Sequence, residues 1–237
     1  MKKVLIACEE SQTVCKAFRA RGHEAYSCDI QEPSGGHPEW HIKGDVLPIL
    51  NGGSFTTEGG CDVTIDKWDL IIAHPPCTYI SNAGACRLYP KKGQLDYKRY
   101  ADGLKAKLFF MAFWYYGYFK CGKIAIENPL PSSVYEMPQK SQVIQPYEFG
   151  EPYTKKTYLW LFGLPPLIPT LVCGERKPYL PSGTSRYAGA NKNKNTVHGS
   201  KMRSKTFVGI AEAMAEQWGN YIMESEEYNG HIKHGLW

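Results

Sequence analysis

The stretch Trp68-Asp69-Leu70-Ile71-Ile72-Ala73-His74-Pro75-Pro76-Cys77 decides the fold, because an apolar run ends there in a histidine and two prolines. Residues 68–73 are apolar apart from Asp69, and turn-forming residues follow them, which is typical of a short buried strand. Cys77 is thereby placed just beyond the end of a strand. It either reacts with a ligand there or packs as a small apolar residue.

Runs of the same kind recur along the chain and alternate with helical patterns. Short apolar, β-favouring runs are found at Lys3–Cys8, Glu24–Asp29, Lys123–Ile126 and Thr157–Phe162. Apolar residues at three- and four-residue intervals predict helices over Ser11–Arg21, Tyr97–Lys120 and Thr206–Met223. We expect the aromatic residues from Phe109 to Phe119 to pack in the core. Strands that alternate with helices predict an α/β fold, with a mostly parallel sheet covered by helices on both faces.

Composition and length are those of a folded, globular protein. The chain has 237 residues, of which 43% are hydrophobic, and its net charge is +5. Glu9 and Glu10 end the apolar N-terminal stretch too early for a signal peptide, and the run Leu108–Phe119 is shorter than the ~20 residues that cross a bilayer. The eight cysteines form no C-x-x-C pair. We therefore expect a cytoplasmic protein with reduced thiols, no metal and no membrane segment.

Positive charge is concentrated in one segment near the C-terminus. Residues 174–205 hold eight lysines and arginines against the single acid Glu175. Those that we expect to contact a ligand are Lys192, Lys194, Lys201 and Arg203. The segment is rich in glycine, proline, serine and asparagine, which is typical of a loop. It is either a solvated surface insertion or a loop whose cations contact nucleic-acid phosphates while two tyrosines offer stacking faces.

Polar residues follow several predicted strands. Asp29 ends the second apolar run, and Asp45 lies in a Gly-Asp-Val stretch that indicates another strand end. Each carboxylate either accepts the hydroxyl groups of a ribose, as in nucleotide-binding folds, or caps the start of a helix. Cys77 and Glu127 also follow strands, so we expect both to lie at the edge where parallel sheets bind their ligands.

A thiol and a carboxyl at one edge suit the chemistry of a pyrimidine ring. Carbon 5 of cytosine is a poor nucleophile until a thiolate adds to carbon 6, which makes carbon 5 enamine-like and able to attack an electrophilic methyl group. A carboxyl near ring nitrogen 3 assists by supplying a proton or a strong hydrogen bond. Together with a methyl donor, this pair predicts methyl transfer to a pyrimidine.

Two motifs resemble those of the cytosine carbon-5 DNA methyltransferases. Pro75-Pro76-Cys77-Thr78-Tyr79-Ile80-Ser81-Asn82-Ala83-Gly84 is similar to the nucleophile loop of that family, which reads Pro-Cys-Gln followed by an aromatic residue, Ser and often Ala-Gly. Glu127-Asn128-Pro129 is similar to its Glu-Asn-Val motif. Both occur in the family's order, each behind a predicted strand. The likeness runs discontinuously from about Val4 to Trp160 and resumes at residues 207–215, in the last predicted helix.

The resemblance implies a Rossmann-like class I S-adenosylmethionine-dependent methyltransferase fold, with DNA as the partner. The catalytic residues that it implies are Cys77 as the attacking thiolate, Glu127 at ring nitrogen 3 and Lys155 as a contact of the base. The cofactor contacts are Ala7, Ser11, Asp29 at the ribose, Asp45 at the adenine, and Pro75. The remaining substrate contacts are Pro76, Ser81 and Asn128, beside the four basic residues named above.

The first loop departs from the family. Typical members open with a Phe-x-Gly-x-Gly cofactor loop, whereas this chain has Ala7-Cys8-Glu9-Glu10-Ser11-Gln12, with no glycine to let the backbone approach the methionine moiety. Ala7 and Ser11 are small enough to permit a similar path. Thr78 stands where the family has glutamine, and His74 either lowers the pKa of Cys77 or is a loop residue that hydrogen-bonds backbone.

A second departure concerns the contact with the base. The family's Pro-Gln-x-Arg-x-Arg motif is present only as Pro152-Tyr153-Thr154-Lys155-Lys156-Thr157. Lys155 either supplies the positive charge without the planar fork of arginine, or both lysines are exposed charges ahead of a strand.

Three segments follow from this comparison: a catalytic domain at 1–162, a basic recognition element at 163–205, and a C-terminal helix with a tail at 206–237. The middle segment is small for a target-recognition domain, so we expect short or relaxed base recognition, helped by self-association into a homodimer. A flipped or unpaired base must enter the pocket. Two rivals stay open: the same chemistry on RNA or a free pyrimidine nucleotide, and a catalytically silent nucleic-acid-binding module with the same fold.

Overall fold

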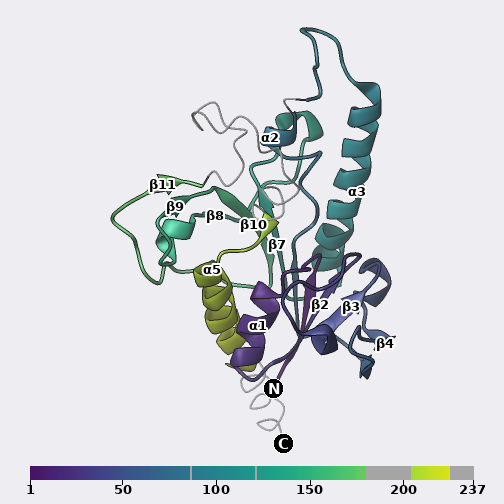
Figure 1. Cartoon of the computed structure of the whole chain (residues 1–237), viewed down its shortest axis with the longest axis vertical. Coiled ribbons are helices and arrows are strands. Elements are labelled where there is room, and N and C mark those ends of the chain that lie inside the picture. Colours follow the sequence, from purple (N-terminus) through teal and green to yellow (C-terminus); the bar gives the residue numbers. More distant parts are fainter. Residues whose placement is uncertain (86, 121, 180–203, 225–237) are drawn as a thin grey trace, which may run out of the picture.

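Seven strands form one mixed sheet in the order β3-β2-β1-β6-β7-β10-β8 (Figure 1). The computed structural model describes residues 1–85, 87–120, 122–179 and 204–224. The strands of the sheet are β1 Lys3–Ala7, β2 Glu24–Asp29, β3 His41–Lys43, β6 Leu70–Ala73, β7 Ile124–Pro129, β8 Gln142–Ile144 and β10 Thr157–Phe162. β1, β2, β3, β6 and β7 run parallel, and β10 is antiparallel to both β7 and β8. The predicted α/β fold with a mostly parallel sheet is therefore confirmed.

Helices and short strands complete the described chain. The α-helices are α1 Thr13–Ala20, α2 Asn82–Ala85, α3 Tyr97–Phe119 and α5 Val208–Ala213, and α5 continues as a π-helical turn, η5 Met214–Trp218. The 3-10 helices are η1 Pro38–Trp40, η2 Leu47–Ile49, η3 Ser133–Tyr135 and η4 Pro146–Glu148. β4 Gly53–Thr56 and β5 Asp62–Ile65 form an antiparallel hairpin, and β9 Tyr153–Thr154 pairs in parallel with β11 Lys177–Pro178. Within these described residues, no helix is both long and apolar enough to cross a bilayer.

Each face of the sheet has its own core because successive side chains of a strand point to opposite faces. In β1, Val4 and Ile6 belong to the core under α1 and α5, whereas Leu5 and Ala7 belong to the core under α3. Figure 1 shows α1 and α5 side by side, with α3 on the other side of the strands. β6 is buried along its whole length between the two cores, which explains its uninterrupted apolar sequence.

α3 differs from its prediction on one point. Phe110 and Phe113 are buried as expected, but Tyr115, Tyr118 and Phe119 are 51%, 60% and 69% exposed. The expectation that this aromatic run packs in the core is therefore wrong for its last turns. α3 is a single helix on the outside of the sheet, so only one of its faces can contact the strands.

The position of the site follows from the strand order. The chain leaves β1 to form β2 on one side, and the strand on the other side of β1 is β6. Connections therefore diverge between β1 and β6, which leaves a crevice beyond the carboxyl ends of these strands. Ala7, Asp29 and Ala73 end their strands at this crevice.

Candidate active site

A pocket of about 880 Å³ lies at the carboxyl ends of β1, β2, β6 and β7. This volume is near the upper end of the ~300–1,000 Å³ range of small-molecule sites, so the pocket has room for more than one small group. The predicted site residues that line it are Ser11, Asp29, Pro75, Pro76, Cys77, Ser81, Glu127, Asn128 and Lys155. The structure thus brings together the two motifs that lie about fifty residues apart in the sequence.

The Cys77 loop is tied directly to the neighbouring strand. Nδ2 of Asn128 donates a hydrogen bond of 2.7 Å to the carbonyl oxygen of Pro75, and Asn128 is 2% exposed. The Ser81 amide donates to the carbonyl oxygen of Cys77 across 2.9 Å, which closes one turn after the cysteine. Asn128 follows Glu127 in β7, so this contact also fixes the cysteine loop relative to Glu127.

Arg99 and Gly84 hold the far end of the same loop. Nη2 of Arg99 donates to the carbonyl oxygens of Thr78 and Gly84, at 3.2 and 3.0 Å. A Cβ atom at Gly84 would lie 2.2 Å from the Thr78 carbonyl oxygen, so only glycine permits this approach. Arg99 also lines the pocket, and its guanidinium lies 5.0 Å from the ring centre of Tyr79.

His74 and Glu127 form a buried pair in the pocket wall. Nδ1 of His74 lies 3.0 Å from Oε2 of Glu127, and the two side chains are 8% and 14% exposed. Burial acts to raise the pKa of Glu127, but the hydrogen bond and charge of His74, together with the charge of Lys155, hold that pKa below its ordinary value. Glu127 is therefore a carboxylate at neutral pH, and Nδ1 of His74 is the donor. Nε2 of His74 is buried and has no hydrogen-bond partner within the described part of the chain.

Lys155 and Lys156 connect β9 to β10, and both line the pocket. Lys155 is half-buried, with Nζ 5.5 Å from the ring centre of Phe207, whereas Lys156 is exposed. The interpretation that these lysines are exposed charges ahead of a strand is correct for Lys156. Lys155 instead lies close enough to Glu127 to lower the pKa of its carboxyl group.

The first loop turns without glycine. Cys8 and Gln12 adopt left-handed backbone conformations, with φ of 60° and 57°, although side chains at such positions are strained. Departures of this kind persist where the surrounding structure fixes them, and they cluster at functional sites. Cys8, Glu10 and Ser11 line the pocket, so the strained loop forms one of its walls.

Glu9 occupies the start of α1. Its carboxylate accepts hydrogen bonds from the amides of Val14 and Cys15, at 2.7 and 3.1 Å, and the residue is 5% exposed. Burial raises the pKa of Glu9; the nearby His74 charge and these hydrogen bonds reduce the effect but do not reverse it. Two amides that would otherwise be available to an anionic ligand at this helix end are therefore taken by the protein itself.

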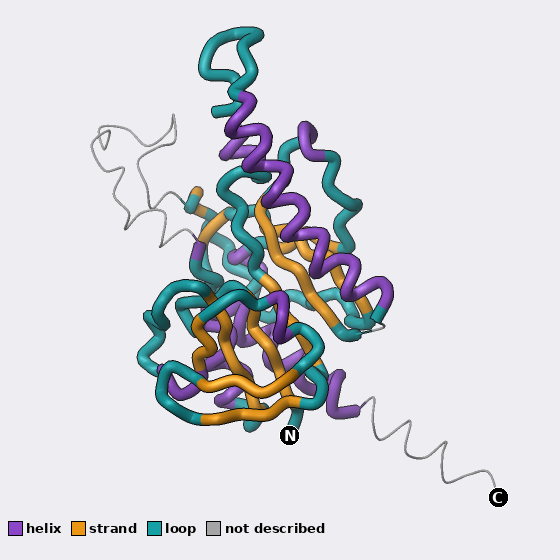
Figure 2. Tube along the Cα trace, turned by 90° about the vertical axis from the view of Figure 1, so that its right-hand side faces the viewer, coloured by secondary structure: helices purple, strands orange, loops and turns teal. Residues whose placement is uncertain are grey.

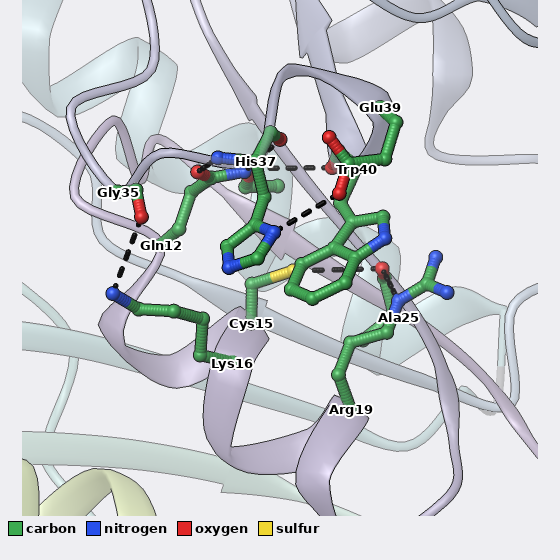
Figure 3. Close-up of polar contacts among 10 residues, drawn as sticks. Gln12, Cys15, Lys16, Arg19, Ala25, Gly35, His37, Glu39 and Trp40 are labelled. Atoms are coloured by element: carbon green, nitrogen blue, oxygen red, sulfur yellow. Dashed lines mark hydrogen bonds and ion pairs between the residues drawn. The ribbon is translucent and has the colours of Figure 1, made fainter. Parts of the chain in front are cut away.

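Gln12 fixes the segment that follows β2 (Figure 3). Its side-chain amide donates to the carbonyl oxygen of His37 across 2.7 Å and accepts from the His37 amide across 3.1 Å. The His37 ring stacks on Trp40 with centres 3.7 Å apart, and the Arg19 guanidinium lies 5.0 Å from the Trp40 ring. This packing holds the segment against α1.

The remaining predicted cofactor contacts have different surroundings. Asp29 lines the pocket, and its Oδ1 accepts from the Gln31 amide across 2.9 Å. Asp45 does not line the pocket, and its carboxylate accepts a hydrogen bond from the Leu47 amide across 3.1 Å. Ala7 is fully buried in β1 and contributes no lining surface. Each of the two aspartates thus accepts from the amide two residues on, and only Asp29 lines the pocket.

Thiols near the site differ in their surroundings. Burial, followed by the charge of Asp29, raises the pKa of Cys8, and burial raises the pKa of Cys28 to about 12. Both therefore stay protonated at neutral pH. Cys77 is half-buried in the pocket wall. Among the cysteines that the structure describes, none forms a disulfide.

Sequence reasoning missed several cations of the pocket wall. Arg87, Arg99, Lys156 and Lys205 line it together with Lys155, close to the Cys77 loop. The acids Glu9, Glu10 and Asp29 line the side formed by β1 and β2. Among the described residues, no three or more histidine, cysteine, aspartate or glutamate side chains lie close enough together to hold a metal ion. Arg99 gave no recognisable signal because it lies in a helix, far along the chain from the loop that it holds.

Four predicted contacts, Lys192, Lys194, Lys201 and Arg203, lie outside the described residues. The chain matches no protein-family model and no curated protein.

Proposed function

We propose that the chain is a Rossmann-like class I methyltransferase that transfers a methyl group from S-adenosylmethionine to carbon 5 of cytosine in DNA. The observation that carries this proposal is that Cys77, the ionised Glu127 and Asp29 line one pocket at the switch point of the sheet. The strand order, with antiparallel β10 between β7 and β8, supports the same fold class. The two motifs that resemble the cytosine carbon-5 methyltransferases meet at this pocket.

The pocket fits S-adenosylmethionine at the ribose and differs from the expected pattern at the methionine end. Asp29 ends β2 and offers its carboxylate to the ribose hydroxyl groups. Glu9 already accepts from two amides of α1, so the cofactor carboxylate requires other donors. Lys205 and Thr206 line the pocket and supply an ammonium group and a hydroxyl. When bound, the cofactor supplies the electrophilic methyl group.

Glu127 prepares the ring for addition. His74 engages Oε2, which leaves Oε1 for the base. An ionised carboxylate accepts from the exocyclic amino group of cytosine and stabilises a ring that has taken a proton from solvent at nitrogen 3. This protonated ring accepts a nucleophile at carbon 6 more readily, because the displaced electron pair neutralises the positive charge.

Cys77 then carries the covalent step. Its thiolate forms a bond to carbon 6, the π electrons of the 5,6 bond move to the 4,5 bond, and the electron pair of the 3,4 bond returns to nitrogen 3. Carbon 5 is now an enamine carbon, and the bound cofactor would supply the electrophilic methyl group that it attacks. A base, for which ordered water suffices, removes the proton at carbon 5. The 5,6 double bond re-forms, and Cys77 leaves as a thiolate.

Cations around the pocket suit the DNA backbone. Arg87, Lys156 and Lys205 lie on its lining, on the side of the cysteine loop. A flipped nucleotide brings its flanking phosphates to such a rim, where cations hold them without reading sequence. In the sequence, residues 174–205 hold eight lysines and arginines, of which Lys205 is described and lines the pocket.

A mechanism-based adduct tests the proposal. Purified protein is incubated with S-adenosylmethionine and duplex DNA that carries 5-fluorocytosine, and the products are separated on a denaturing gel. Fluorine cannot leave carbon 5 as a proton does, so an active enzyme stays attached. We expect the adduct in the wild type and in Cys8→Ser, which alters another pocket thiol, and none in Cys77→Ser. An adduct that survives in Cys77→Ser would refute the assignment.

Two alternative functions are each supported by one observation. Cations on the pocket lining would also bind the phosphate of a free pyrimidine nucleotide or of RNA, so the same assay is run with 5-fluoro derivatives of each. Glu9 at the start of α1 favours a catalytically silent nucleic-acid-binding module, because it removes two donors from the cofactor. Calorimetry with S-adenosylmethionine separates this case, since a silent module gives no binding heat.

A further inference from the structure

α3 carries a row of apolar side chains on the face opposite the sheet. Its buried residues are Gly103, Phe110, Phe113 and Gly117. The outward row, which we call the α3 stripe, consists of Tyr97, Ala101, Leu104, Leu108, Ala112, Tyr115 and Phe119. Tyr97, Leu108 and Phe119 are 78%, 70% and 69% exposed, and Tyr115 is 51% exposed. A helix that packs by one face on a sheet is normally polar on the other, so an apolar row of this length marks a contact surface.

The spacing of the stripe indicates a second helix. Its members recur at intervals of four, three and four residues, so Tyr97, Leu108 and Phe119 are eleven residues apart. An eleven-residue repeat corresponds to about 3.67 residues per turn, close to that of a straight helix, so the stripe stays on one side of α3 along its ~34 Å length. Figure 2 shows α3 as one long helix that passes the strands with part of its length and projects beyond them with the rest. The stripe therefore offers a long, straight contact rather than a local patch.

The stripe is symmetric about Leu108. Members lie four, seven and eleven residues away from Leu108 on both sides. An antiparallel copy of α3, related by a two-fold axis at Leu108, therefore meets the stripe in register. Leu104 then faces Ala112 of the second copy, and Ala101 faces Tyr115, so a large side chain faces a small one at both positions. Tyr97 faces Phe119 at the ends, where two aromatic rings can pack together.

Charges beside the stripe suit the same register. Lys98, Lys105, Phe109 and Tyr116 share one flank of the stripe, and the two-fold axis places this flank beside the same flank of the second copy, so Lys98 falls close to Tyr116 and Lys105 close to Phe109 of that copy. Within one chain, Asp102 already pairs with both lysines, at 3.0 Å to Lys98 and 3.9 Å to Lys105. We propose that the α3 stripe is the interface of a homodimer in which two α3 helices pack antiparallel about Leu108.

This interface is independent of the proposed methyl transfer, and sedimentation velocity on the full chain tests it. We expect the wild type to shift from monomer to dimer as its concentration rises from about 1 µM to about 100 µM. Leu108→Glu places two like charges at the two-fold axis. The dissociation constant of the dimer should therefore rise at least about tenfold. Because Leu108 is 70% exposed, this variant should fold like the wild type. Ile168→Glu, at a residue that is 71% exposed outside α3, is the matched control and should leave the dimer intact.

Disulfide cross-linking tests the register. Facing Cα atoms of close-packed helices are near enough for a disulfide. Leu108→Cys meets its own equivalent at the axis and should cross-link under mild oxidation, beyond the level of the wild-type cysteines. Leu104→Cys alone should not, whereas the double variant Leu104→Cys/Ala112→Cys should. A monomer at every concentration, a dimer that persists in Leu108→Glu, or cross-linking of Leu104→Cys alone would overturn the proposal.

Discussion

His74 donates a hydrogen bond from Nδ1 to Oε2 of Glu127 across 3.0 Å, and this contact keeps a buried carboxyl group ionised. The two residues are 53 positions apart, but His74 follows β6 and Glu127 lies in the neighbouring parallel strand β7. The same imidazole acts electrostatically on Glu9, which belongs to the first loop. His74 thus lies between the side of the pocket proposed for the cofactor and the side proposed for the base.

Replacing His74 should move the pKa of Glu127 in a direction that depends on the new side chain. In His74→Leu, the effect of burial on the pKa of Glu127 is opposed only by the charge of Lys155, so this pKa should rise. His74→Asn can keep a donor near Oε2 and should restore most of the low pKa. The measurement is a carbon-13 NMR titration of glutamate carboxyl groups, with Glu127→Gln to assign the signal. An unchanged titration in His74→Leu would show that the contact does not set the charge of Glu127.

Glu9 should make stability depend on pH in the opposite sense to an ordinary ion-paired acid. Its pKa is raised in the folded protein, so its contribution is fully present below the unfolded pKa of about 4.5 and is lost as the pH rises through the folded value. Glu9→Gln removes this titration. The free energy of unfolding of the wild type minus that of Glu9→Gln should therefore fall as the pH rises from about 3 to 8. Urea unfolding across this pH range measures the difference. If the difference rose with pH, burial would not favour the protonated form of Glu9.

Several features of the fold and site could be predicted because they depend on local pattern. β2 and β10 have the predicted bounds, since apolar runs flanked by turn residues mark buried strands. Cys77 and Glu127 were expected at one edge because carboxyl ends of parallel strands meet there. The structure places both residues on one pocket.

Other features depend on contacts between distant segments, which a sequence pattern does not contain. Arg99 holds the Cys77 loop from the first turn of a helix, and no motif marks it. Glu9 occupies the start of α1, although the sequence suggested only a loop without glycine. In α3, apolar residues on all sides fit a core helix and an outer helix equally well. Only the position of α3 on the sheet shows that Leu108 and Phe119 face outward.

Gly84→Ala should damage the Cys77 loop. The new Cβ would meet the Thr78 carbonyl oxygen at 2.2 Å, and backbone cannot yield as a side-chain end can. We expect a loss of roughly 1–3 kcal/mol in stability or, if the loop shifts instead, a large loss of adduct formation with 5-fluorocytosine DNA. Gly174→Ala is the control, since its Cβ would meet open space. Thermal unfolding and the adduct assay together distinguish the two responses, and a Gly84→Ala protein that matches Gly174→Ala in both would disprove the need for glycine.

Asp29 and Asp45 offer a matched test of the cofactor site. Both carboxylates lie at the carboxyl ends of neighbouring strands, but Asp29 lines the pocket and Asp45, which accepts from the Leu47 amide, does not. A hydrogen bond to a charged group contributes about 1.5–3 kcal/mol. The affinity for S-adenosylmethionine, measured by calorimetry, should therefore fall roughly 10- to 150-fold in Asp29→Asn. Asp45→Asn keeps an oxygen that can accept from the Leu47 amide, and its affinity should stay within about twofold of the wild type. Equal losses in the two variants would restore Asp45 as a cofactor contact, and wild-type protein that binds no cofactor would leave the silent module as the better account of the pocket.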